Sequence, residues 1–457
     1  SEFKLVVTDA DEQQLVTYQP AADQIQPIPD PAKAIAAPEE IKTNDELYFA
    51  AQHLEQYRHA TYRPDDYYLE GLKRDKNDDR INDAYGLLLY RRGLFAESQT
   101  YFERAIARET EHNTNPFSGA AHYHLGLSLM MQGQLKEAYD HFFKATWSYE
   151  TQSVGFLALA QVKSLEGDLD TALVDVDKGL NTNYRDMTLR TLKVNLLRRA
   201  HKNEAAKQLV KENTAIDPLC LGNRYEAWRL DPSTEHQQAL EKALNHKLNN
   251  HLSLAEPYIK AGQFADALAI IQLYSADSPI KSYYEAFLSN KLGDTKAAEA
   301  YAKQGAAGDP DYVFPNRLMD VVVLNAVIEQ NPSDGLAAYY LGDFYYDRKV
   351  YDRATQLWEQ CVKADPDYPM AHRNLSIAYF NRQHQPQMAL HELELAFKLD
   401  PQNSRLVFEL DTLYEKLNRP LTERLAFLQD HFDLTQQRDD SYISLVTLLN
   451  ETGDYQQ

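Results

Sequence analysis

The chain has 457 residues, with 47 lysines and arginines against 68 aspartates and glutamates, which gives a formal net charge of −21. This balance argues against nucleic acid or an anionic membrane as the main partner, because binding phosphates needs clustered cations. Two cysteines, Cys220 and Cys361, are too few for a disulfide framework and favour a cytoplasmic location. The longest apolar runs, such as residues 321–324, are too short to span a bilayer.

Residues 1–20 are predicted to form a β-hairpin that is the remnant of a preceding β domain. Short apolar runs at residues 5–7 and 15–16 lie on either side of a polar turn at residues 9–14. An isolated two-stranded hairpin is only marginally stable in water, so we expect it to dock on another element.

A linker is predicted at residues 21–42, which hold four prolines and several alanines. Proline removes a backbone donor and biases the chain toward extended conformations. Helices are predicted from about Thr43 onward, where Thr43 and Asn44 can cap a helix with apolar residues at helical spacing.

A repeated pattern organises the rest of the chain: a glycine, an apolar residue two positions later and an alanine five positions after the glycine. It runs from Gly133 to Ala138 and again from Gly167, which is 34 residues later. Gly342 and its counterpart Ser376 are also 34 residues apart. Further copies begin at Gly93, Gly262, Gly293, Lys349 and Gly453. The pattern predicts antiparallel helix pairs, with the turn glycine in the left-handed conformation that ends the first helix.

Each pair also has a small residue on its first helix and a large one on its second. Gly126 is followed by Phe142, and Gly342 by Trp358. The small residue lets the two helices approach closely, and the large one fills the space beside it. Because a single pair cannot bury its apolar face, the pairs must stack on their neighbours.

A 34-residue period with these placements resembles the tetratricopeptide repeat. The resemblance implies an all-α, right-handed superhelical solenoid of about eight or nine hairpins. We divide it into a first block at residues 43–218, a second at 219–310 that begins with irregular helices, and a third at 311–457. The repeat spacing is broken at residues 219–250 and 311–334. The last repeat contains only its first helix, which predicts that the repeats continue.

Several segments resemble a bacterial family that carries an N-terminal β-rich domain, related in shape to galactose mutarotases, before its tetratricopeptide repeats. They are residues 53–61 (HLEQYRHAT), 121–126 (AHYHLG), 314–317 (FPNR) and 372–375 (HRNL). This resemblance implies that residues 1–20 are the tail of that β domain. It also implies a connection to carbohydrate, although it transfers no catalytic residue.

Tetratricopeptide arrays line a concave groove with the first helix of each pair, and this resemblance defines the predicted partner-binding residues. They are Tyr123, Met130, Tyr283, Phe287, Tyr339, Asp343, Tyr346, Asp347, Arg373 and Asn381. The same reasoning adds Leu127, Met131, Ile377 and Phe380. Aromatic side chains interleaved with polar ones suit an extended peptide or a helix. Alternatively, these tyrosines only pack between neighbouring helices, and the sequence does not decide between the two.

The predicted function is a non-catalytic scaffold whose groove binds a protein or peptide, or its own β domain. Acidic groove positions suit a basic or hydroxyl-rich partner, but we favour the simpler interpretation that the charge of −21 keeps a long array soluble. Two alternatives remain. One is a structural arm for a carbohydrate-binding β domain, and the other is an α-helical carbohydrate-active enzyme, which the 34-residue period disfavours because its hairpins would be longer. The oligomeric state is left open.

No cofactor, metal or catalytic residue is predicted. The sequence lacks a glycine-rich phosphate loop, H-E-x-x-H, C-x-x-C and G-x-S-x-G. His122 and His124 are two residues apart, so on a helix they point to different faces, whereas helical metal pairs prefer a spacing of three or four.

Overall fold

The computed structural model describes residues 3–21, 28, 30–31 and 33–453. The chain divides into two compact units, Ser1–Arg74 and Asp75–Gln457. The first unit therefore includes the first two helices, which the sequence analysis placed with the repeats. The last four residues, on which the predicted continuation of the array rests, lie outside the described part.

The first unit begins with the predicted hairpin, and the structure confirms it. Strand β1 (Leu5–Thr8) pairs antiparallel with β2 (Gln14–Tyr18), with Leu5 opposite Tyr18. All side chains of both strands are exposed, including the apolar ones.

The end of the predicted linker is held against a helix by hydrogen bonds. A short 3-10 helix, η1 (Pro38–Glu40), precedes α1 (Asn44–Tyr57) and α2 (Pro64–Arg74). The Arg74 guanidinium donates to the carbonyls of Ile41 and Pro38, at 2.7 and 3.1 Å. Thr43 caps α1 through a capping box with Glu46, which confirms the predicted helix start.

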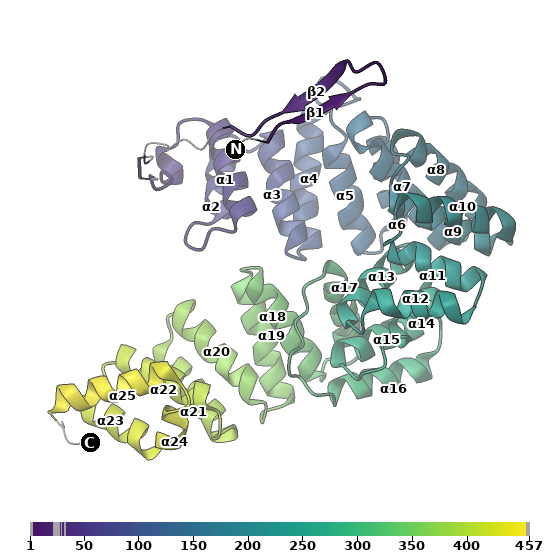
Figure 1. The fold of residues 1–457 in the computed structure, drawn as a ribbon. Helices are drawn as coiled ribbons and strands as arrows, with labels where there is room; N and C mark the ends of the chain where they lie inside the picture. Colours follow the sequence, from purple (N-terminus) through teal and green to yellow (C-terminus); the bar gives the residue numbers. More distant parts are fainter. Residues whose placement is uncertain (1–2, 22–27, 29, 32, 454–457) are drawn as a thin grey trace. The chain divides into compact units, whose positions relative to one another are not determined.

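In the second unit every described element is an α-helix, which confirms the all-α prediction (Figure 1). The first half contains α3 (Asp79–Arg91), α4 (Phe95–Glu109), α5 (Ala120–Met131), α6 (Leu135–Ala145), α7 (Tyr149–Glu166), α8 (Leu169–Thr182), α9 (Met187–Arg199), α10 (Asn203–Ile216), α11 (Leu221–Leu230), α12 (Thr234–Leu244), α13 (Leu248–Lys260) and α14 (Phe264–Gln272). The second half contains α15 (Pro279–Lys291), α16 (Thr295–Ala306), α17 (Leu318–Gln330), α18 (Gly335–Asp347), α19 (Tyr351–Ala364), α20 (Pro369–Asn381), α21 (Pro386–Leu399), α22 (Ser404–Lys416), α23 (Leu421–Asp430), α24 (Phe432–Thr435) and α25 (Asp439–Thr452). Many helices that follow each other along the chain pack as hairpins, such as α3 with α4 and α18 with α19.

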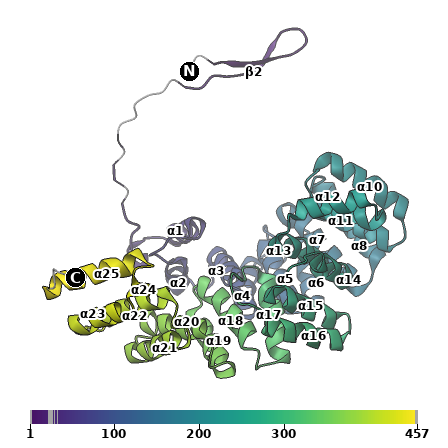
Figure 2. The same cartoon turned by 60° about the horizontal axis from the view of Figure 1, so that its bottom comes forward.

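The segment at 219–250, expected to be irregular, forms a further hairpin. Helices α11 and α12 pack against each other and lie side by side in both views (Figure 2). The turn between them, residues 231–233, has no glycine, so the glycine-based repeat pattern did not reveal them. The expected single helix near 316–330 is present as α17.

The predicted pairing of small and large residues is confirmed in atomic detail. A Cβ atom on Gly126 would lie 2.6 Å from the Phe142 ring, and one on Gly342 would lie 2.6 Å from Trp358 Nε1. The turn glycines of the repeats have positive φ, as expected. Lys349 takes the same conformation, with a φ of 63°, at the turn where the sequence has no glycine.

Two parts of the second unit that are far apart in sequence also touch. The turn between α3 and α4 lies against α17 and α18, because a Cβ on Gly93 would lie 3.1 Å from Val321 and 3.3 Å from Phe344. An ion pair of 3.7 Å joins Arg353 to Glu97 nearby.

Candidate partner-binding face

Polar side chains link the first helices of three successive hairpins, α18, α20 and α22. Asp343 Oδ1 accepts hydrogen bonds from Asn374 Nδ2 at 3.0 Å and from Trp358 Nε1 at 3.1 Å. Arg373 donates to the Asn374 side chain at 3.1 Å and binds both carboxylate oxygens of Glu409, at 2.7 and 2.5 Å. We call Asp343, Asn374, Arg373 and Glu409 the polar ladder. It brings together two of the predicted groove residues, Asp343 and Arg373.

A hollow of about 240 Å³ lies beside the ladder, between α20 and α22. Its walls include Ile377, Phe380, Asn381, Phe408, Glu409, Thr412 and Lys416. The first three are positions that the sequence analysis assigned to the groove. Lys416 places its ammonium 5.4 Å from the centre of the Phe380 ring. We call this hollow the α20–α22 groove.

The α22 residues of this groove were missed because the repeat spacing changes by one residue. Counting the same offsets from Asp411, which is 35 residues after Ser376, gives Phe408, Thr412 and Lys416. The loop between α20 and α21, where His384 has a positive φ of 54°, accommodates the change. A search that allowed this shift would have found the second wall.

Burial raises the pKa of Asp343 to about 7. Hydrogen bonds from Trp358 and Asn374, together with the charge of Arg373, act in the opposite direction but do not cancel this effect. The carboxyl group therefore keeps its proton in the folded chain at a pH where the unfolded chain has already lost it.

This raised pKa predicts a pH-dependent effect of Asp343→Asn. The stability that the neutral carboxyl provides is complete below about pH 4 and is lost as pH rises through about 7. Asparagine does not titrate, so the free energy of unfolding of the variant does not fall in this way. Relative to the wild type, we expect it to rise by up to about 1 kcal/mol per pH unit between pH 5 and 7. Urea unfolding across this range measures the difference. Asp347→Asn, on an exposed carboxylate of the same helix, is the control, and parallel curves for Asp343→Asn and wild type would refute the prediction.

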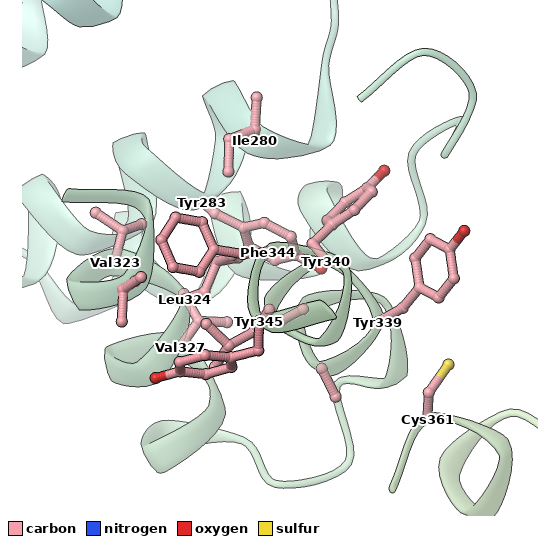
Figure 3. Packing of buried hydrophobic residues seen from close by; sticks show 14 of the residues in the cluster. Ile280, Tyr283, Val323, Leu324, Val327, Tyr339, Tyr340, Phe344, Tyr345 and Cys361 are labelled. Carbon is pink, nitrogen blue, oxygen red and sulfur yellow. The ribbon is translucent and has the colours of Figure 1, made fainter. Parts of the chain in front are cut away.

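Several predicted tyrosines and phenylalanines are core residues instead. Tyr283 is fully buried and donates to Asp334 Oδ1 at 2.7 Å, and Phe287 is also buried. Tyr339 is 9% exposed and packs edge-on against Tyr368 at 4.9 Å. Figure 3 shows Tyr283 and Phe344 packed in one group, with the Tyr339 ring directed away from it. For Tyr283 this placement favours the packing alternative.

Of the remaining predicted residues, only Asn381 lines the α20–α22 groove beside the ladder. Met130 and Phe287 line a separate cavity of about 700 Å³. Tyr123 is half-buried and its ring lies 5.9 Å from that of Phe142. Tyr346 is half-buried against Trp358, at 5.1 Å between ring centres. The side chains of Asp347 and Asn381 are exposed.

The two histidines take different partners, consistent with the predicted different faces. His122 Nδ1 lies 2.9 Å from His141 Nδ1, and His124 Nδ1 lies 2.8 Å from Asp83. Among the described residues, no group of three or more histidine, cysteine or acidic side chains is placed to hold a metal ion. Within that same part of the chain, no helix has the length and apolar character needed to cross a bilayer.

Comparison with known proteins identifies the repeats. A family model of the tetratricopeptide repeat matches residues 85–146 and 323–369, which correspond to α3–α6 and to the region from α17 to the start of α20. The chain therefore carries tetratricopeptide repeats arranged as a helical solenoid.

Solved structures of similar type include the Cut9–Hcn1 hetero-tetramer of APC/C, at 10% identity over 90% of this chain and 98% of the other, with a TM-score of 0.27. Yeast Tom70 matches at 11% identity over 83% and 96%, with a TM-score of 0.29. MamA from Desulfovibrio magneticus RS-1 matches at 18% identity over 42% and 97%, with a TM-score of 0.26. Likeness at this level carries no argument about what this chain binds.

Proposed function

We propose that this chain is a non-catalytic scaffold that binds a protein or peptide segment in the α20–α22 groove. The observation that carries the proposal is the groove itself, a hollow of about 240 Å³ with half-buried apolar walls and charged groups at its edge. Ile377, Phe380 and Phe408 offer apolar contact, while Glu409 and Lys416 offer one charge of each sign. Such a combination suits one or two anchoring side chains of an extended or helical segment.

The polar ladder supports this proposal by fixing the groove walls. Arg373 and Glu409 form a bidentate ion pair between α20 and α22, which fixes the distance between the two helices. A groove held in this way loses little conformational freedom when a partner binds. Asp343 is already hydrogen-bonded to Trp358 and Asn374, and Arg373 to Glu409. We therefore assign these two residues to shaping the groove and not to direct contact.

A photo-crosslinking experiment tests the proposal. A photoreactive amino acid is placed at Asn381, which lines the groove, or at Met388, which is exposed on the adjoining helix α21. We expect bacterial lysate to yield a protein crosslinked from position 381 but not from 388. Adding Ile377→Glu, which puts a charge on the groove wall, should reduce that product at least about tenfold. Equal products from both positions, or a product indifferent to Ile377→Glu, would exclude the groove as the binding site.

The structural-arm function is kept as the second candidate because of the exposed hairpin. Leu5, Leu15, Val16 and Tyr18 are each more than half exposed, and a two-stranded hairpin with bare apolar side chains is a ready template for further β pairing or packing. This favours a β partner for the hairpin. The described chain holds no other strand, so a mutarotase-like domain and its sugar remain an implication of the sequence resemblance alone. A cytoplasmic location likewise remains a proposal from the two free cysteines.

A further inference from the structure

The charges around the α20–α22 groove are unequal in sign. Among the residues that line the groove, the charged ones are Glu409 and Lys416. Glu409 is already shared between two guanidinium groups, because Arg373 donates to it at 2.7 and 2.5 Å and Arg405 Nε donates to it at 2.9 Å. Its negative charge is therefore more than compensated, and it is not available to attract a basic partner.

Lys416 adds a further positive charge at the edge of the groove. Its side chain is exposed, and it makes no ion pair with any residue in the part of the chain that the structure describes. The carboxylates nearby face other cations, since Asp440 lies 4.0 Å from Arg438 and Glu415 lies 3.4 Å from Arg424. The groove is thus locally positive, although the chain as a whole carries a net charge of −21.

Two of these cations lie at opposite ends of the groove. Arg405 is one turn before Phe408, the first residue of α22 that lines the groove, and Lys416 is the last. Successive spacings of four, three and four residues place Arg405, Glu409, Thr412 and Lys416 on one face of the helix. Eleven residues of α-helix, at a rise of 1.5 Å each, separate the two cations by about 16 Å. An extended peptide covers that distance in about five residues.

We infer that the partner of this groove is an acidic protein segment, with two carboxylates about five residues apart and an apolar side chain between them. The apolar side chain contacts Ile377, Phe380 and Phe408, and the carboxylates face Arg405 and Lys416. Exposed cations are well hydrated and need no partner, but their sign selects among segments that carry the same apolar anchor. This inference rests on the proposed function and specifies its partner.

Three short, fluorescently labelled peptides test the selection. They have the same leucine and phenylalanine anchors and differ only at two positions five residues apart, which hold glutamate, glutamine or lysine. Their binding to the full chain is followed by fluorescence anisotropy. We expect the glutamate peptide to bind about tenfold more tightly than the glutamine peptide, and the lysine peptide to bind most weakly. Sodium chloride at about 0.5 M should remove most of the difference between the first two.

Variants of the two cations locate the effect. Lys416→Gln and Arg405→Gln should each weaken binding of the glutamate peptide about threefold and leave the glutamine peptide unchanged. Lys242→Gln, at an exposed position of α12 in another hairpin, removes the same charge and should affect neither peptide. Equal binding of the glutamate and glutamine peptides, or a preference that survives in both variants, would overturn the acidic partner while the groove remained a binding site.

The protein crosslinked from position 381 decides the question if none of the peptides binds. Mass spectrometry of that product locates the segment that lies in the groove. A segment with acidic residues at the stated spacing would support the inference. A basic or uncharged segment, or a product made of two copies of this chain, would refute it. Absence of any specific product would mean that the proposed function itself has failed, and this inference with it.

Discussion

Replacing Trp358 by alanine is expected to lower the free energy of unfolding by about 3–5 kcal/mol, among the largest effects of any single change in the chain. Trp358 is 2% exposed, and its indole occupies the space that Gly342 leaves beside it. Alanine would leave a cavity there. It would also remove the Nε1 donor from the half-buried Asp343 carboxyl. Guanidinium unfolding followed by circular dichroism measures the loss.

Trp147→Ala is the matched control for this prediction. Trp147 is 58% exposed, and its main described contact is the Lys144 ammonium, 3.9 Å from the ring centre. An exposed cation–π pair contributes about 0.5–1 kcal/mol. If the two tryptophan variants unfolded at the same guanidinium concentration, the assigned role of Trp358 between α18 and α19 would be wrong.

Replacing Glu226 by alanine should cost a similar amount, about 3–5 kcal/mol, for an electrostatic reason. Glu226 is fully buried and pairs with Arg198 at 2.7 Å, and after its removal Arg198 would keep only Asp266, at 3.0 Å. The Asn195 amide and the Tyr258 hydroxyl would lose their acceptor inside the protein, where water cannot easily replace it. The same unfolding measurement applies.

The control removes a carboxylate of the same kind from the surface. Glu423 is paired with Arg419 at 3.8 Å, and both side chains are largely exposed, so Glu423→Ala should change stability by no more than about 1 kcal/mol. Glu226→Gln, which keeps an acceptor oxygen, should fall between these two variants. A loss for Glu226→Ala no greater than that for Glu423→Ala would show that the buried cluster contributes little.

Those parts of the fold that depend on local chemistry could be predicted from the sequence. The turn glycines, the Gly126–Phe142 and Gly342–Trp358 contacts and the Thr43 cap each follow from what one or two side chains allow. Helices α11 and α12 were missed because the turn between them has no glycine, and α11 is held instead by tertiary contacts such as the ion pair between Arg198 and Glu226.

The candidate sites were harder to predict, because offsets along a helix do not give burial. Tyr283 and Tyr339 satisfy the groove offsets, yet Asp334 and Tyr368 close over them from elements that the offsets ignore. A cavity lined by Gln161, Met187, Leu221 and Tyr258 could not be found in this way, because these residues come from four separate helices and no short motif marks them.

The contact of the α3–α4 turn with α17 and α18 has a consequence for cooperativity. In a linear array each repeat touches only its neighbours, so one end can melt while the other stays folded. Here Gly93 lies against Val321, 228 residues further along the chain. Melting of α17 and α18 would therefore strip the packing from an early repeat as well. We therefore expect the repeats between these two points to unfold more nearly together than those of an open linear array.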